Sequence, residues 1–169
     1  MNQESQVRII EKRITDLLAD EPGYFIVEVV IKPLNNIKVF VDADQGAAID
    51  RLTKLNRVLY KWVEESMFPD GNFSLEVSSP GLDEPIKLHR QYLKNIGRYV
   101  EVLEKEGEMK EGKLLSATEN EIIIEETKAR LTGKNKKNED GQGKGKKMEL
   151  IQHTILFENI KATTIQIKF

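Results

Sequence analysis

Ser78 and Ser79 lie upstream of His89, and a serine with a histidine is the pair that many hydrolases use for nucleophilic catalysis. In such enzymes the serine lies on a sharp strand-to-helix turn, and a third group orients the histidine as a base. Neither serine lies in a motif of that kind, and the sequence offers no evident residue to orient His89. A small hydrolase is therefore the weakest of the functional hypotheses.

Metal binding is the second chemistry that the side chains could support. Asp42 and Asp44 follow a predicted strand, where carboxylates could bind magnesium, but two acids in a turn are usually solvated caps. The chain has no cysteine and only two histidines, His89 and His153, which excludes thiolate zinc sites and disfavours histidine-based ones. We expect no metal, no cofactor, no small-molecule substrate and no catalysis.

A connection rich in proline and glycine is the most distinctive stretch, and residues 75–86 read LEVSSPGLDEPI. Pro80 presets φ for the first central position of a tight turn and Gly81 accepts positive φ at the second, which predicts a type II turn. Pro85 favours an extended Glu84. This stretch resembles the signature of RimP-type ribosome maturation factors, which usually have arginine where this chain has Glu84. The alternative is a rigid domain connector with no binding role.

Composition predicts two small domains. The 169 residues are 39% hydrophobic and 32% charged, which is little apolar material for one large core. We assign residues 1–84 to an N-terminal α/β sandwich domain, 85–92 to a connector and 93–169 to a C-terminal domain. The net charge of −2 requires any basic RNA-binding surface to be local.

Hydrophobic runs indicate the cellular compartment. Residues 1–13 contain no apolar run of the signal-peptide type, and no stretch approaches the roughly 20 apolar residues of a membrane span. Together with the lack of cysteine, this predicts an intracellular, cytoplasmic protein without a membrane segment.

Hydrophobic periodicity predicts the order α-β-β-α-β in the N-terminal domain. Apolar residues at spacings of three and four indicate amphipathic helices at 5–18 and 49–63. β-branched and aromatic residues indicate strands at 24–31, 37–41 and 73–77, of which the first two form a hairpin. Two helices on a small sheet must cover one face, with Trp62 in the core.

Strand patterns dominate the C-terminal domain, after a short helix or turn at 89–95. Five strands are predicted at 98–103, 110–116, 121–126, 148–157 and 163–168, with one 3₁₀ turn at 158–161 before the last. This layout predicts an SH3-like (Sm-like) small barrel, which the RimP resemblance also implies. The fold class of the whole chain is α+β.

Residues 128–147 are rich in lysine and glycine. They cannot bury enough apolar area to offset the entropy of ordering, which predicts a disordered loop between two strands. Lysines there could neutralise RNA phosphates without reading base sequence, or the loop could be a solubilising insertion without contacts. The candidate RNA-contact residues are Lys134, Lys136, Lys137, Lys144, Lys146 and Lys147.

The resemblance implies a non-enzymatic factor that binds the free small ribosomal subunit. It implies contact with a small-subunit protein near the decoding centre and assistance to ribosomal RNA folding. We expect a monomer. The alternative is a peptide-binding adaptor that uses the barrel and has no RNA role. The candidate partner-binding residues are Ser79, Pro80, Gly81, Leu82 and Asp83.

Overall fold

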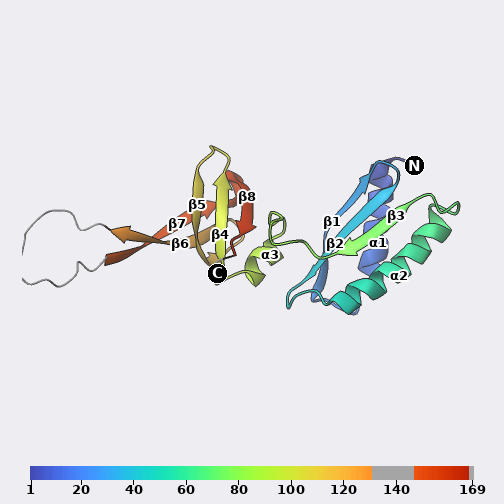
Figure 1. The fold of residues 1–169 in the computed structure, drawn as a ribbon, viewed down its shortest axis with the longest axis horizontal. Coiled ribbons are helices and arrows are strands. Elements are labelled where there is room, and N and C mark those ends of the chain that lie inside the picture. Colours follow the sequence, from blue (N-terminus) through green and yellow to red (C-terminus); the bar gives the residue numbers. More distant parts are fainter. Residues whose placement is uncertain (131–146, 168–169) are drawn as a thin grey trace, which may run out of the picture. The chain divides into compact units, whose positions relative to one another are not determined.

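The structure, a computed structural model, describes residues 1–130 and 147–167 of the 169 in the chain. The chain divides into two compact units, Met1–Gly81 and Leu82–Phe169, which we call the N-terminal and C-terminal units (Figure 1). Each unit has its own hydrophobic core. Among the described residues, no helix combines the length and the apolar character that a membrane crossing requires.

The N-terminal unit contains a three-stranded sheet and two helices. Its elements are α1 (Gln3–Leu17), β1 (Tyr24–Lys32), β2 (Asn36–Ala43), α2 (Ile49–Ser66) and β3 (Ser74–Ser78). The central strand β2 pairs antiparallel with β1 and parallel with β3. Parallel neighbours need a crossover connection, which α2 supplies. The predicted order of elements is confirmed, with bounds that differ by a few residues.

Both helices of the N-terminal unit contribute to one core. Helix α1 begins after Asn2, whose Oδ1 accepts a hydrogen bond from the backbone N–H of Ser5 at 2.9 Å. Alternate residues of β2 point to the same side of the sheet and are buried with both helices. Trp62, predicted to lie in the core, is half-buried and packs against the core. The fully buried members are Ile10, Ile14, Ile37, Val39, Val41, Leu55, Leu59 and Val63.

The C-terminal unit contains a five-stranded antiparallel sheet. Its elements are α3 (His89–Lys94), β4 (Tyr99–Glu104), β5 (Met109–Ala117), β6 (Glu121–Arg130), β7 (Lys147–Leu156), the 3₁₀ helix η1 (Phe157–Asn159) and β8 (Ile160–Ile165). The strand order is β7-β6-β5-β4-β8. The five strands and the 3₁₀ turn are present with shifted bounds: the turn lies at Phe157–Asn159 and the last strand begins at Ile160, three residues earlier than predicted. No pairing in the described chain joins the edge strands β7 and β8, so the sheet is open and the barrel stays a prediction.

Strand β6 passes very close to β5 at Gly112. A Cβ atom on Gly112 would lie 2.6 Å from the backbone carbonyl oxygen of Glu125, so only glycine fits this position without a shift of the backbone. The core beside it is apolar. Its fully buried members are Val100, Val102, Leu114, Ile122, Ile124 and Ile155.

Beyond this point β6 and β7 continue as a two-stranded ribbon. β5 pairs with β6 only as far as Glu125, whereas β7 pairs with β6 as far as Arg130 (Figure 1). The predicted loop at 128–147 is therefore wrong at its ends, since residues 128–130 and 147 are strand. Cross-strand pairing, with Lys128 opposite Glu149, forms this ribbon, in which Met148 and Leu150 stay exposed. The rest of the predicted loop, residues 131–146, lies outside the described residues.

The connection after β3 differs from the predicted type II turn. The turn lies at Leu82 and Asp83, while Pro80 and Gly81 belong to neither a turn nor a strand. Gly81 is also not among the glycines with positive φ. A residue before proline favours extended backbone, which fits a chain that turns only after Gly81.

Candidate functional site

The predicted partner-binding segment, Ser79 to Asp83, follows directly after β3. Ser79, Gly81, Leu82 and Asp83 are exposed, and Pro80 is half-buried. The boundary between the two units falls within this segment, after Gly81. The side chains are thus accessible to a partner, and their role in binding stays a prediction.

The chain that follows is attached firmly to the C-terminal unit. The backbone N–H of Ile86 donates to the carbonyl of Thr163 at 2.8 Å, and the N–H of Leu88 donates to Oε1 of Gln91 at 2.9 Å. Tyr92 donates its hydroxyl to Oγ1 of Thr163 at 2.8 Å inside the core. Burial raises the pKa of the Tyr92 hydroxyl. These contacts fix residues 86–92 onto strand β8.

The groups considered for catalysis and metal binding do not assemble into a site. Nε2 of His89 donates to the carbonyl oxygen of Thr118 at 2.9 Å, so the ring is engaged by the turn after β5. Oδ1 of Asp42 accepts from the N–H of Ala43 at 2.8 Å. Within residues 1–130 and 147–167, no three His, Asp or Glu side chains are grouped in a way that could hold a metal ion.

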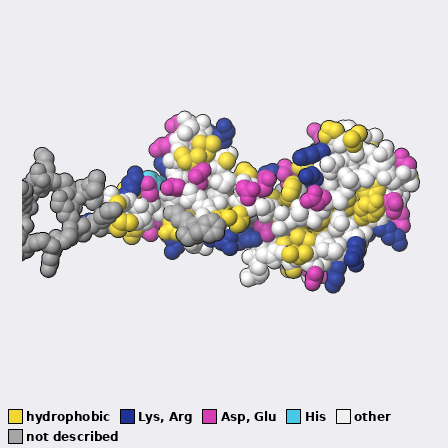
Figure 2. All heavy atoms as spheres, in the orientation of Figure 1, with side chains coloured by type: hydrophobic (Ala, Val, Ile, Leu, Met, Phe, Trp, Pro, Cys, Tyr) yellow, Lys and Arg dark blue, Asp and Glu magenta, His cyan; other side chains and the backbone are white. Residues whose placement is uncertain are grey.

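Only one of the candidate RNA-contact lysines belongs to the described part of the chain. Lys147 begins β7 and is exposed. The others, Lys134, Lys136, Lys137, Lys144 and Lys146, lie outside the described residues. On the face drawn in Figure 2, acidic and basic side chains are interspersed over the described surface of each unit.

The ribbon carries a charge cluster of its own. Nε2 of His153 lies 2.7 Å from Oε2 of Glu126, and Nζ of Lys128 lies 3.5 Å from Oε1 of the same carboxylate. The hydrogen bond from His153 is the main cause that lowers the pKa of Glu126. The cluster ties β6 to β7 near the point where β5 stops pairing with β6.

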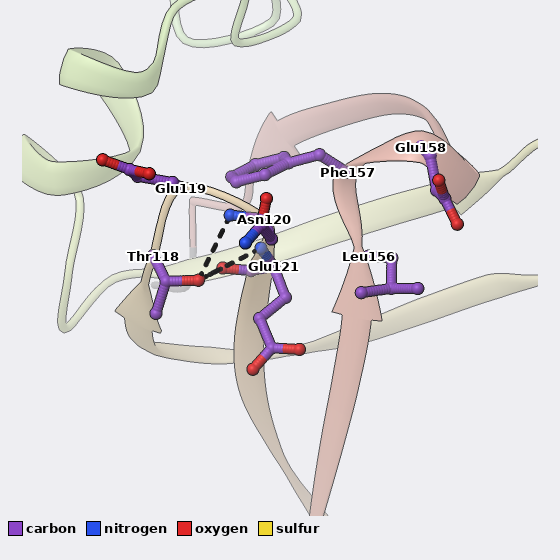
Figure 3. Close-up of a pocket in the computed structure, with 7 residues that line it drawn as sticks. All are labelled: Thr118, Glu119, Asn120, Glu121, Leu156, Phe157 and Glu158. Atoms are coloured by element: carbon purple, nitrogen blue, oxygen red, sulfur yellow. Dashed lines mark hydrogen bonds between the residues drawn. The ribbon is translucent and has the colours of Figure 1, made fainter.

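A hollow of about 590 Å³ opens at one end of the C-terminal sheet, and we call it the Phe157 hollow. It lies between the turn that joins β5 to β6 and the corner where β7 enters η1. Figure 3 shows the Phe157 ring beside Asn120, with Glu119 and Glu158 to either side. The residues that line it are Thr118, Glu119, Asn120, Glu121, Leu156, Phe157 and Glu158.

Hydrogen bonds hold both walls of the Phe157 hollow. Oγ1 of Thr118 accepts from the backbone N–H groups of Asn120 and Glu121 at 3.3 and 3.2 Å. The N–H of Phe157 donates to the carbonyl of Asn120 at 2.9 Å, which joins the two walls. The Phe157 ring contacts the Tyr92 ring edge to face, with centroids 5.0 Å apart.

A second hollow of about 460 Å³ adjoins the first and shares Glu119 and Phe157 with it. Its other lining residues are Lys87, His89 and Tyr92. Sequence reasoning missed both hollows. The available signal was the acidic turn TENE at 118–121, but nothing local indicates that this turn meets Phe157.

Comparison with known proteins identifies a family match in the N-terminal unit. Residues 14–83 match the family model described as the RimP N-terminal domain. The match ends at Asp83, within the exposed segment that follows β3.

Two relatives extend the similarity along the chain, and both are named ribosome maturation factor RimP. The protein from Christiangramia forsetii is 33% identical over 115 residues, which cover 68% of this chain and 72% of the relative. The protein from Cytophaga hutchinsonii is 31% identical over 132 residues, which cover 76% of this chain and 79% of the relative. With this identity over most of both sequences, the chain belongs to the RimP family of ribosome maturation factors.

Proposed function

We propose that this protein is a ribosome maturation factor of the cytoplasm that binds the free small ribosomal subunit as a monomer and assists its assembly without catalysis. The observation that carries the proposal is the similarity to two proteins named ribosome maturation factor RimP, over 76% and 68% of the chain. We further propose that the C-terminal unit is an SH3-like barrel, on the grounds of its five short strands and the 3₁₀ turn before the last.

The mechanism requires selective binding and no bond chemistry. A factor that binds one conformation of the immature subunit more tightly than the others shifts the population towards that conformation. Ribosomal RNA near the bound protein would then fold with fewer unproductive alternatives. The proposed partners are ribosomal RNA and a small-subunit protein near the decoding centre.

Two surfaces are proposed to contact the subunit. The exposed segment Ser79 to Asp83 offers main-chain groups together with Leu82, which is 42% exposed. The Lys-rich residues 128–147 offer positive charge for phosphates, and Lys147 and Lys128 are exposed on the ribbon.

Sedimentation tests the proposal directly. The protein in a cell extract should migrate with free small subunits and be missing from translating ribosomes. A protein found in no ribosomal fraction would exclude the maturation role and would favour the alternative, a peptide-binding adaptor.

Salt dependence then tests the RNA contacts. Changing Lys134, Lys136, Lys137, Lys144, Lys146 and Lys147 together to Gln should weaken binding to purified subunits. It should also flatten the plot of log K against log[salt] by about one unit or less for each lost phosphate contact. An unchanged affinity and slope would place any RNA contact elsewhere.

A further inference from the structure

We propose that the Phe157 hollow binds a cationic side chain, arginine in preference to lysine, from a basic segment of a protein partner. The hollow lies entirely in the C-terminal unit. The binding of a cationic side chain does not depend on the proposed function. Only the source of the basic segment, a protein of the small subunit, rests on it.

Charge is the first argument. Three carboxylates, those of Glu119, Glu121 and Glu158, line the hollow, and none of them forms an ion pair with a residue in the described chain. Other carboxylates of this unit, such as Glu104 and Glu126, are paired with basic side chains. Three glutamates without an ion pair thus line one concave, partly apolar surface.

The apolar part of the hollow determines which cation fits best. Phe157 is half-buried and Leu156 is 38% exposed, so an aromatic and an aliphatic side chain line the hollow together with the three glutamates. A guanidinium group can stack on an aromatic ring while it donates hydrogen bonds to carboxylates in its own plane. An ammonium group is more strongly hydrated and makes only point contacts, which favours arginine over lysine.

The hollow is formed before any ligand binds. Thr118 fixes the turn on one side, and the Phe157–Asn120 hydrogen bond connects that turn to η1. The rings of Tyr92 and His89 contact the Phe157 ring edge to face. Because these contacts already order the lining residues, binding needs little further loss of conformational freedom.

The same chemistry argues against RNA as the occupant. Phosphate groups dominate RNA surfaces, and three uncompensated carboxylates repel them. The Phe157 hollow and the Lys-rich residues 128–147 would therefore select partners of opposite charge. In the proposed function, the first would contact a basic protein and the second would contact RNA.

Titration of the ¹⁵N-labelled full chain with short peptides tests the chemistry alone. The probes are acetyl-Gly-Val-Arg-Val-Gly-amide, the same peptide with lysine, and the same peptide with citrulline, which keeps the shape of arginine without its charge. We expect saturable shifts at the amides of residues 118–121 and 156–158, tightest for arginine and missing for citrulline. Equal shifts with citrulline, or shifts elsewhere only, would overturn the proposal.

Two variants identify the groups responsible. Glu119→Gln with Glu158→Gln should weaken arginine-peptide binding about threefold or more, as expected for the loss of two exposed ion pairs. Phe157→Leu keeps apolar volume but removes the ring face, so it should abolish the preference for arginine over lysine. A Phe157→Leu protein that is folded and keeps that preference would contradict the stacking role.

The matched control removes two carboxylates from other places. Glu106 is exposed in the turn between β4 and β5, at the opposite end of β5, and Glu64 is exposed on α2. The variant Glu64→Gln with Glu106→Gln has the same net charge as the test variant. It should bind the arginine peptide as tightly as the parent does. If its affinity falls as much as that of the test variant, the loss is due to net charge and not to the hollow.

Binding to purified small subunits separates the two proposals. If the parent binds subunits and Glu119→Gln with Glu158→Gln binds less than the control variant, the hollow contacts a subunit protein. If the parent binds no subunits, the proposed function fails, and the peptide titration still decides the inference. If the variant Glu119→Gln with Glu158→Gln binds subunits as tightly as the control variant, the hollow does not contact the subunit. Its assignment to a subunit protein is then wrong.

Discussion

The two units cover their sheets by different means. In the N-terminal unit, helices of 15 and 18 residues supply much of the core against a three-stranded sheet. In the C-terminal unit, the only α-helix in the described residues has six residues, and the core lies mainly among the five strands. The N-terminal unit therefore depends on the fit of side chains between layers. The C-terminal unit depends more on backbone spacing and on a few buried polar contacts.

The largest effect should come from the N-terminal core. Leu59→Ala removes a fully buried side chain of α2 and should lower the free energy of unfolding by about 2–5 kcal/mol. Trp62, the only tryptophan of the chain, reports the unfolding of this unit by fluorescence. Circular dichroism should show that the C-terminal unit keeps its transition. A simultaneous loss of both transitions would mean that the units do not fold independently, and Ile49→Ala, at an 81% exposed residue, is the control.

A backbone contact should dominate the response of the C-terminal unit. Gly112→Ala places a methyl group against the Glu125 carbonyl and should cost about 1–3 kcal/mol through forced displacement of β6. The loss should appear in circular dichroism, while Trp62 fluorescence stays that of the parent. Gly23→Ala, where a Cβ meets nothing within 4 Å, should be nearly neutral. A neutral Gly112→Ala would show that β6 can move away freely.

A buried polar contact should give a smaller effect with a distinct pH signature. Tyr92→Phe removes the hydrogen bond to Thr163 and should destabilise the C-terminal unit by about 1 kcal/mol. Because burial raises the pKa of Tyr92, the parent should lose stability as the pH rises above about 10, the ordinary pKa of tyrosine. The variant should lack this contribution. Denaturant titrations across that range measure it, and parallel curves would exclude Tyr92 as the cause.

The smallest effect is expected on the ribbon. Glu126→Gln should weaken the cluster with His153 and Lys128 by about 0.2–1 kcal/mol, because the site is partly exposed. Since the pKa of Glu126 is lowered, its contribution is present above the ordinary carboxyl pKa of about 4 and is lost as the pH falls below it. Hydrogen exchange at the ribbon amides should therefore differ between parent and variant at neutral pH and converge in acid. A constant difference would contradict the ionic origin.

Features that local sequence determines were predictable. Spacings of three and four in α1, and β-branched runs in β1 and β2, specify elements with little help from the rest of the chain. The family could likewise be inferred from residues 75–86 alone. The turn was predicted at Pro80 and Gly81 but lies at Leu82 and Asp83, because the turn preference of a Pro-Gly pair does not by itself fix the position of a turn.

Features that join distant residues were not predictable. The Phe157 hollow needs the turn at 118–121 to meet a residue that follows β7, and sequence periodicity says nothing about that meeting. The ribbon was missed for a related reason. Composition predicts which residues cannot form a hydrophobic core. Strand pairing does not need such a core, and it extends β6 as far as Arg130.

The position of β8 in the sheet has a consequence for the order in which the chain folds during its own synthesis. β8 pairs with β4, and Thr163 holds both Ile86 and Tyr92, so the C-terminal sheet cannot be completed before β8 has left the ribosome that makes it. The N-terminal unit has its last strand at Ser78 and can form while the rest of the chain is still being translated. During that interval β4 and β5 are present without the strand that shields the outer edge of β4, and an unpaired edge of this kind can pair with other chains.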